Sequence, residues 1–309
     1  MKVHAVTGAF GYTGKYIAQR LLNKGLSVKT FTNSWQRKNE FGDRIEVSPF
    51  YFDKPEKLAE ALDGVSVLYN TYWVRFNHHT FKHSEAIENS IKLFQAAKKA
   101  GVGRIVHTSI LKPDKNSPLE YYSGKGILEE ELAATGISYS ILRPGVIFGK
   151  EDILINNIAW MIRKFPVFGM FGNGNYKLQP IYVEDFADLA VEQGLKTSNA
   201  VIDATGPEIF TYKELVKTIS EIISGKEITV FPLPDLVGFW ISKLVGLFKG
   251  DNLVTYQEIK GLKADLLYSD AQPAGKTKLT DWLKQNKDTV GKDYANELKR
   301  RLDRTIPYK

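Results

Sequence analysis

Two residues near the middle of the chain, Tyr121 and Lys125, have the types and the spacing of a proton-transfer pair. They lie four residues apart in the segment 119–134, which we expect to be helical, so their side chains project from one face. A nearby ammonium group favours tyrosinate and lowers the pKa of a tyrosine from about 10. The phenol is thereby brought toward the range that suits proton transfer at neutral pH. Such a pair also occurs by chance in many helices, so its meaning depends on the elements around it.

A glycine-rich loop near the N-terminus indicates a dinucleotide site. In VTGAFGYTGKYIAQRLL, an expected strand at 2–6 is followed by Gly8, Gly11 and Gly14 and by an expected helix at 13–24. The first glycine permits a tight turn, the second admits a pyrophosphate, and the third lets the helix pack closely on the strand. The helix N-terminus then attracts the phosphates. The alternative is that the glycines serve only the turn. We expect cofactor contacts from Gly8, Phe10, Gly11, Tyr12, Thr13 and Gly14.

The end of the second expected strand favours NADP(H), with NAD(H) as the alternative. NAD-binding proteins usually place an acidic residue about 20 residues past the glycines, but KTFTNSWQRK, 29–38, contains none. Asn33 and Ser34 can donate hydrogen bonds there, and Arg37 and Lys38 can meet a 2′-phosphate unless they belong to a solvated loop. Asp53 is a candidate acceptor for the adenine amino group, or a helix cap before Pro55.

Strands and helices alternate through the first half of the chain. We expect strands at 2–6, 26–32, 45–51, 65–70 and 103–109, and at 137–149 a strand that runs into a loop. We expect helices at 13–24, 55–62, 81–100 and 119–134. This alternation predicts an α/β fold with a Rossmann-type, doubly wound parallel sheet. We expect residues 1–150 to form the NAD(P)-binding core, with 177–205 returning to it. Residues 151–176 and 206–309 should form a smaller, mostly helical C-terminal substrate-binding lobe.

The composition narrows the classes of function. The 309 residues contain no cysteine, which excludes disulfides, thiolate catalysis and Cys-ligated metals. The net charge of +7 is spread along the chain and is interpreted as surface charge rather than a nucleic-acid site. The N-terminus lacks the long apolar run of a signal peptide. The apolar segment 228–250 contains two prolines and charged residues, so we expect no transmembrane segment and a cytoplasmic protein.

With the glycine loop, IVHTS (105–109), EYYSGK (120–125) and ILRPGVIFG (141–149) in this order, the chain resembles the short-chain dehydrogenase/reductase superfamily. It is most similar to the extended and atypical branches, which include epimerase/dehydratase-like and NmrA-like NAD(P)-binding proteins. The resemblance covers residues 1–205 well and is much less specific past 226. It implies that Tyr121 transfers a proton, that Lys125 tunes it and binds the nicotinamide ribose, and that Ser109 holds the substrate oxygen. Asn70 and Pro144 are further expected cofactor contacts.

Two features depart from the family pattern or from helix propensity. Where the extended branch commonly has an arginine for nucleotide-sugar binding, YKLQPIYVED carries Lys177 and Gln179, which weakens a nucleotide-sugar assignment. Gly124 and Gly126 each cost about 1 kcal/mol relative to alanine in a helix. Their presence predicts the close approach of the cofactor or of a neighbouring element.

The aromatic segment NTYWVRFNHHTFKH, 70–83, follows the fourth expected strand. We expect Tyr72, Trp73 and Arg75 to line a substrate pocket with Thr108, or the aromatic side chains to pack in the core. His79 and His83 are four residues apart, but no third ligand is evident and we expect no metal site. The helix expected at 235–250 is interpreted as closing the substrate lobe, or as facing lipid or a protein partner; in each case the substrate would be apolar.

Three functions follow. The first is an NADP(H)-dependent oxidoreductase that acts on a carbonyl/alcohol pair of a small molecule with a Ser–Tyr–Lys site. The second is a nucleotide-sugar epimerase or dehydratase with tightly bound NAD(P). The third is a non-catalytic NADP(H)-binding regulator or assembly factor. The sequence leaves the substrate, the direction of the reaction and the oligomeric state open.

Overall fold

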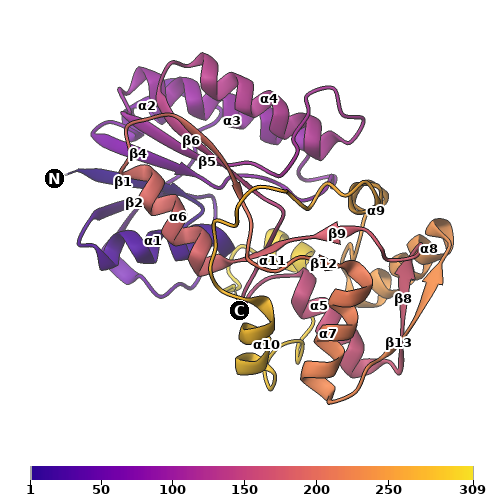
Figure 1. The fold of residues 1–309 in the computed structure, drawn as a ribbon. Helices are drawn as coiled ribbons and strands as arrows, with labels where there is room; N and C mark the ends of the chain where they lie inside the picture. Colours follow the sequence, from indigo (N-terminus) through magenta and orange to yellow (C-terminus); the bar gives the residue numbers. More distant parts are fainter. Residues whose placement is uncertain (1, 309) are drawn as a thin grey trace. The chain divides into compact units, whose positions relative to one another are not determined.

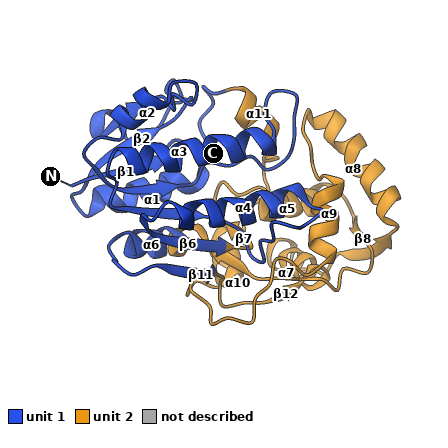
Figure 2. Ribbon diagram, turned by 90° about the horizontal axis from the view of Figure 1, so that it is seen from above, with its two compact units in different colours: residues 1–143, 186–203, 304–308 blue, residues 144–185, 204–303, 309 orange. Residues whose placement is uncertain are grey.

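The chain is organised as two compact units. The computed structural model describes residues 2–308, so the termini of the expected ranges, Met1 and Lys309, lie outside the described residues. Unit 1 comprises the residues up to 143 together with 186–203 and 304–308, and unit 2 comprises 144–185 and 204–303 (Figure 2). The chain leaves unit 1 at Pro144 rather than at 150, and the segment 304–308 returns to it.

A seven-stranded sheet with the order β11-β6-β5-β4-β1-β2-β3 forms the centre of unit 1 (Figure 1). Neighbouring strands from β3 to β6 pair in parallel. The chain order reverses between β1 and β4, and open sheets of this type bind ligands at the carboxyl ends of the strands near such a point. This confirms the predicted Rossmann-type α/β fold. The strands are β1 Val3–Thr7, β2 Ser27–Phe31, β3 Ile45–Ser48, β4 Val65–Asn70, β5 Arg104–Thr108, β6 Ser138–Pro144 and β11 Ala200–Ala204.

Helices cover both faces of this sheet (Figure 1). On one face α3 packs against α2 and α4, and the apolar side chains of Leu93 and Leu128 meet Leu68 and Ile105 of the strands in one buried cluster. On the other face Arg20 of α1 forms an ion pair with Asp188 of α6 at 2.6 Å. The helices are α1 Tyr12–Asn23, α2 Pro55–Ala61, α3 His83–Lys99, α4 Glu120–Ala134 and α6 Val183–Gly194, with a short 3₁₀ turn η1 Gly42–Arg44.

Unit 2 contains short strand pairs and helices around its own apolar cluster. The strand expected at 137–149 ends at Pro144, and the chain continues as β7, which pairs in parallel with β10 rather than with the large sheet. Thr211 and Glu214 form a complete capping box at the start of α7. The strands are β7 Val146–Phe148, β8 Val167–Phe171, β9 Lys177–Leu178, β10 Pro180–Tyr182, β12 Phe210–Thr211 and β13 Thr229–Leu233. The helices are α5 Leu154–Lys164, α7 Tyr212–Ser224, α8 Asp235–Lys249, α9 Tyr256–Lys263, α10 Leu279–Asn286 and α11 Glu297–Leu302. None of the helices between residues 2 and 308 is both long enough and apolar enough to span a bilayer.

Candidate functional site

The glycine loop has the geometry that its sequence predicts. Gly8 adopts a left-handed conformation (φ +68°), and the Gly11 N–H donates to the Gly8 carbonyl at 2.8 Å, which closes the turn. A Cβ on Gly14 would collide with this same carbonyl, so only glycine allows α1 to start so close to β1. Helix α1 begins at Tyr12 and no side chain between residues 2 and 308 caps it. Its first N–H groups therefore face the position at which a dinucleotide phosphate binds in this fold.

Arg37 lies against the glycine loop rather than in solvent. Its side chain is only 6% exposed, and its Nη1 donates to the carbonyl of Phe10 at 3.5 Å. The alternative of a solvated loop is thus wrong for Arg37, whereas Lys38 is exposed. The Ser34 N–H is held by the Thr32 hydroxyl at 3.0 Å, and Asn33 is exposed just past β2. A buried guanidinium at the end of β2 is the feature that a 2′-phosphate would need.

The last residues of unit 1 reach this same place. Tyr308 lies beside Arg37, whose Cζ is 4.8 Å from the centre of the tyrosine ring. The Lys38 N–H donates to the Thr305 carbonyl, and Arg304 donates to the Asn33 carbonyl, each at 3.4 Å. No sequence pattern placed Tyr308 in the site, because a contact across some 270 residues leaves no trace in local spacing.

Two expected cofactor contacts have different surroundings from those predicted. Asn70 is fully buried, and its amide oxygen accepts from the Thr7 hydroxyl and the Tyr72 N–H, each at 3.1 Å. Its amide nitrogen lies 3.1 Å from Nδ1 of His107, whose pKa burial holds well below the usual value, so the ring accepts this bond. The side chain of Asn70 thus joins neighbouring strand ends inside the protein, and its contact with a cofactor stays a prediction. Asp53 is not the helix cap, because α2 has Lys54 at its N-cap and no side-chain cap bond; its role toward adenine stays a prediction.

Lys125 projects from α4 into the protein interior. Its Nζ donates to the Thr108 carbonyl at 2.7 Å and lies 4.3 Å from the centre of the Trp73 ring. The side chain is 2% exposed, and burial lowers the pKa of Lys125 to about 7, although the Glu129 carboxylate opposes this shift. The ammonium was expected to lower the pKa of Tyr121 by its charge. A lysine that is about half neutral at pH 7 exerts only part of that effect.

Ser109 is held in a buried polar group that the sequence analysis missed. Its hydroxyl donates to Glu129 at 2.5 Å, and the Glu129 carboxylate pairs with Arg143 at 2.5 Å. This bond to Glu129 raises the pKa of Arg143 and keeps the guanidinium charged. The hydroxyl expected to hold a substrate oxygen is therefore committed to an acceptor inside the protein. Glu129 follows Lys125 by four residues, a helical spacing that could have drawn attention to it.

Tyr121 sits among aromatic rings at the start of α4. Its ring meets Trp73 and His83 edge-on, with centroid distances of 5.6 and 5.8 Å, and Trp73 stacks on His83 at 5.7 Å. Tyr122, the neighbouring tyrosine, is buried. His83 is thus part of an aromatic stack, and the residues from 2 to 308 contain no cluster of three or more metal-ligating side chains.

The two glycines of α4 admit neighbouring protein rather than leaving open space. A Cβ on Gly124 would lie 2.9 Å from both Ile87 of α3 and the Trp73 ring. A Cβ on Gly126 would lie 2.5 Å from the backbone nitrogen of Lys115, in the loop before the helix. The sequence predicted that either the cofactor or a neighbouring element lies close to these glycines. In the structure a neighbouring part of the protein lies beside each of them.

The remaining pocket candidates are packed in several ways. Tyr72 packs against Phe50 and Phe52, with centroid distances of 5.1 and 5.2 Å, and its hydroxyl accepts from Asn89. Arg75 lies half-buried with its Cζ 5.8 Å from the Phe76 ring centre. Core packing, the alternative to a pocket wall, thus describes Tyr72. The last candidates have fixed positions: Thr108 supplies the carbonyl that holds Lys125, and Pro144 is the last residue of β6.

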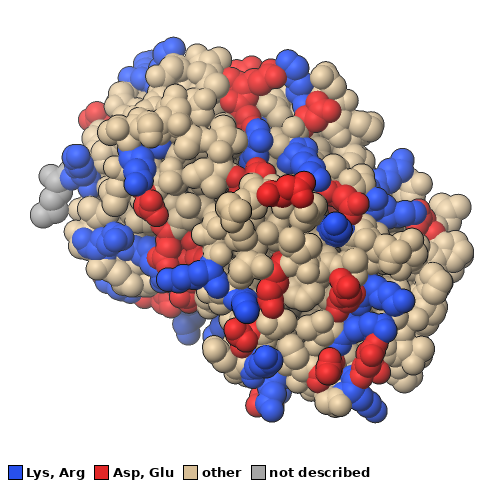
Figure 3. Space-filling model, in the orientation of Figure 1, with Lys and Arg blue, Asp and Glu red and all other residues tan. Residues whose placement is uncertain are grey.

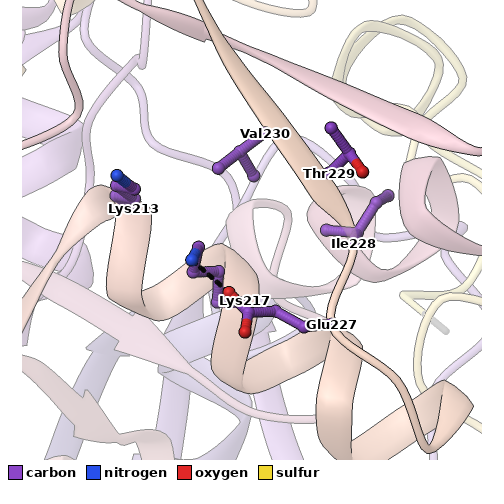
Figure 4. Close-up of a pocket in the computed structure, with 6 residues that line it drawn as sticks. All are labelled: Lys213, Lys217, Glu227, Ile228, Thr229 and Val230. Atoms are coloured by element: carbon purple, nitrogen blue, oxygen red, sulfur yellow. Dashed lines mark ion pairs between the residues drawn. The ribbon is translucent and has the colours of Figure 1, made fainter.

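An open depression of about 400 Å³ lies elsewhere, in unit 2 beside α7 and β13 (Figure 4). It is bordered by an ion pair between Lys217 and Glu227. None of its lining residues belongs to the expected site, and two lysines and a glutamate at an open surface offer no enclosed binding volume. We therefore place the candidate site at the strand ends of unit 1. The depression is lined by Lys213, Lys217, Glu227, Ile228, Thr229 and Val230.

Comparison with known proteins identifies the cofactor class. Residues 8–156 match the family described as NAD(P)H-binding. The chain is 26% identical over 287 residues to NADH dehydrogenase (ubiquinone) 1 alpha subcomplex subunit 9, a mitochondrial protein of Arabidopsis thaliana; the match covers 87% of this chain and 71% of the relative. This relative is mitochondrial, so the comparison gives no support to the expected cytoplasmic location.

Solved structures have the same fold. The triphenylmethane reductase of Citrobacter sp., complexed with NADP(H), matches with a TM-score of 0.75 over 92% of this chain and 99% of its own, at 20% identity. The NADPH-dependent quinone oxidoreductase QOR2 of Escherichia coli, complexed with NADPH, matches with a TM-score of 0.72 over 92% and 98%, at 22% identity. These structures confirm the fold. The family match of residues 8–156 confirms the resemblance to NAD(P)-binding proteins and the expected NAD(P)H cofactor. Catalysis by Ser109, Tyr121 and Lys125 stays a prediction.

Proposed function

We propose that this chain, whose residues 8–156 are an NAD(P)H-binding domain, binds NADP(H) without turning it over and serves as a cofactor-bearing subunit or assembly factor of a protein complex. The observation that carries the proposal is that Ser109 and Lys125, two of the three expected catalytic residues, have partners within the protein. The Ser109 hydroxyl is committed to Glu129, and the Lys125 amine to the Thr108 carbonyl and the Trp73 ring. Both groups thus have partners within the protein, whereas the resemblance expects Ser109 to hold a substrate oxygen and Lys125 to bind the nicotinamide ribose.

The preference for NADP(H) rests on charge at the end of β2. Arg37 is buried against the glycine loop, and residues 29–39 contain no carboxylate that would repel a 2′-phosphate. A buried guanidinium keeps its charge and offers a planar pair of donors to phosphate oxygens. The nicotinamide would supply hydride chemistry when bound. In unit 1 the polar groups of Ser109, Lys125 and Asn70 bind other protein groups, which fixes their positions.

A role within a protein complex is supported by the relatives. The Arabidopsis protein is by name a subunit of NADH dehydrogenase, and its match spans most of both chains. A subunit can use a bound dinucleotide to order its own fold, because a ligand that binds only the native state stabilises that state by mass action. The proposal therefore requires cofactor binding and a protein partner, but no substrate for Tyr121.

An NADP(H)-dependent reductase acting through Tyr121 is the second candidate. Tyr121 is only partly buried, and Lys125 lies four residues on, with a pKa of about 7 that suits a group exchanging protons at neutral pH. The nucleotide-sugar alternative gains no support from its key position, since Gln179 is buried and its amide donates to the Gly206 carbonyl at 2.9 Å.

Ser109→Ala separates the two candidates. Calorimetric titration should show that the wild-type chain binds NADPH and that the variant binds it with an unchanged Kd. Oxidation of NADPH with carbonyl and quinone substrates should be equally slow for both proteins. A fall in kcat of a hundredfold or more in the variant, with binding intact, would support the reductase and reject our proposal. Failure of the wild-type chain to bind NADPH would reject both.

A further inference from the structure

Helix α8 of unit 2 turns its small side chains inward and its large apolar side chains outward. Its buried residues are Gly238, Ser242 and Gly246, which are spaced four apart and form one narrow stripe. A helix of a globular protein normally does the reverse and buries its large apolar stripe. Where α8 lies in Figure 1, at the right-hand edge, Figure 3 shows broad areas without charged side chains. The outward side chains are Leu236, Val237, Trp240, Ile241, Leu244, Leu247 and Phe248.

Packing fixes this orientation. A Cβ on Gly238 would lie 2.7 Å from the Phe171 ring of β8, and a Cβ on Gly246 would lie 2.5 Å from the Asp251 carbonyl. The inward face thus has no room for a leucine or a tryptophan, so α8 cannot rotate to hide its apolar side. Phe248 is 88% exposed and Trp240 is 66% exposed. A continuous apolar surface of this kind marks an interaction site.

A row of lysines and aromatic rings borders one side of the exposed apolar face. Lys243 lies over the ring of Phe239 at 5.5 Å, and this ring meets Tyr256 of α9 edge-on at 6.0 Å. Lys260 lies over the Tyr256 ring at 4.8 Å. The Lys243 Nζ also donates to the Asn252 side-chain oxygen at 3.1 Å. Cation–π contacts therefore hold two ammonium groups beside the apolar side chains, and these contacts do not neutralise their charge.

The nearby carboxylates are occupied within the protein. Asp235 pairs with Lys263 at 2.7 Å, and Glu258 completes the capping box of α9. Asp251 accepts from the Tyr294 hydroxyl and from the Leu298 N–H, each at 2.9 Å. These three carboxylates are thus engaged within the protein, and Lys243 and Lys260 supply positive charge at the border of the apolar face.

We propose that α8 is a membrane-surface helix, and that the chain binds an anionic lipid bilayer with the outward face of α8 in the boundary between headgroups and acyl chains. The outward side chains offer a single hydrogen-bonding group, the indole of Trp240, whereas protein interfaces carry about one hydrogen bond per 100–200 Å². A lipid boundary requires no such bonds, and tryptophan and lysine suit its polar edge. This surface belongs to unit 2 and its function does not depend on the cofactor.

Vesicle flotation with the full chain tests the proposal. Vesicles of phosphatidylcholine containing phosphatidylglycerol should carry the wild-type protein, and those of phosphatidylcholine alone should carry less. The double variant Leu244→Glu with Phe248→Glu should bind at least tenfold less. Leu195→Glu is the matched control, because Leu195 is 58% exposed in unit 1, as Leu244 is 57% exposed in α8. Circular dichroism and NADPH titration of each variant establish that it is folded.

Two results would overturn the assignment to lipid. One is a wild-type chain that does not float with anionic vesicles. If that chain is instead a dimer that the double variant converts to a monomer in light scattering, α8 binds a second copy. The other is undiminished flotation of the folded variant Leu244→Glu with Phe248→Glu.

The double variant Lys243→Glu with Lys260→Glu adds a test of the charged border. It should lose the preference for anionic vesicles, and a retained preference would contradict that part of the proposal.

Discussion

Replacing Lys125 by methionine tests whether burial disfavours the charged form of this lysine. Burial lowers the pKa of Lys125 from 10.5 to about 7 in the folded chain. Between these values the unfolded chain binds more protons than the folded one, so the stability of the wild-type protein rises with pH. Below pH 7 both states are protonated and the folded state carries the full cost of the buried charge. Above about pH 10.5 both are neutral and the cost is gone.

The size of this effect follows from the shift. A difference of roughly 3.5 pKa units, at about 1.36 kcal/mol each, amounts to some 4–5 kcal/mol between the two limits, of which about 2–3 kcal/mol falls between pH 6 and 9. Methionine has a similar length and does not titrate. The free energy of unfolding of Lys125→Met, relative to that of the wild type, should therefore be highest at acidic pH. This difference should fall by about 2–3 kcal/mol between pH 6 and pH 9.

Urea unfolding at pH 6, 7.5 and 9 measures this difference directly. Lys57→Met is the control, because Lys57 is exposed on α2, and its effect on stability should not vary over the same range. A Lys125→Met difference that stays constant with pH would refute the reasoning. It would mean that Lys125 keeps its charge when folded and can lower the pKa of Tyr121 as the sequence analysis expects.

Three further substitutions probe the cofactor site and the packing of α4. Arg37→Ala should weaken NADPH binding by about 10- to 100-fold, because a hydrogen bond to a charged group is lost. The same calorimetric titration should show unchanged binding of NADH. An equal loss of affinity for both cofactors would contradict the prediction. Tyr308→Ala removes the ring beside Arg37 and should weaken NADPH binding about two- to fivefold. Tighter binding would show instead that Tyr308 blocks the site. Gly126→Ala should lower the free energy of unfolding, measured in urea, by about 1–3 kcal/mol. The added Cβ would collide with the Lys115 backbone, and this cost exceeds the gain from the higher helix propensity of alanine. Ser123→Ala is the control, and a stabilising Gly126→Ala would contradict the packing.

The sequence predicted the sheet because the signals for it are local. Alternating apolar strands and helices, and three glycines at a strand–helix junction, are each contained within about 20 residues, and the structure has the predicted parallel order there. The break between β6 and β7 was not predicted, because ILRPGVIFG is apolar throughout and only its pairing partners distinguish the two strands.

The candidate site was less predictable because its contacts are distant in sequence. Ser109 and Glu129 are 20 residues apart, and Arg37 and Tyr308 lie at opposite ends of the chain. The spacing of Tyr121 and Lys125 placed both on one helix face, but it could not reveal that the lysine turns to the Thr108 carbonyl. Burial of Asn70 likewise depends on Thr7 and His107, which belong to neighbouring strands.

The oxidation rate of bound NADPH in the Tyr121→Phe variant tests the central claim most directly. The stoichiometric complexes of wild-type and variant chains are given the same carbonyl and quinone substrates, and loss of the dihydronicotinamide absorbance is followed. Our account predicts equal NADPH binding and the same slow loss in both proteins, because Tyr121 transfers no proton. A fast loss in the wild-type complex that falls by a hundredfold or more in the variant would contradict the account and establish Tyr121 as a catalytic acid.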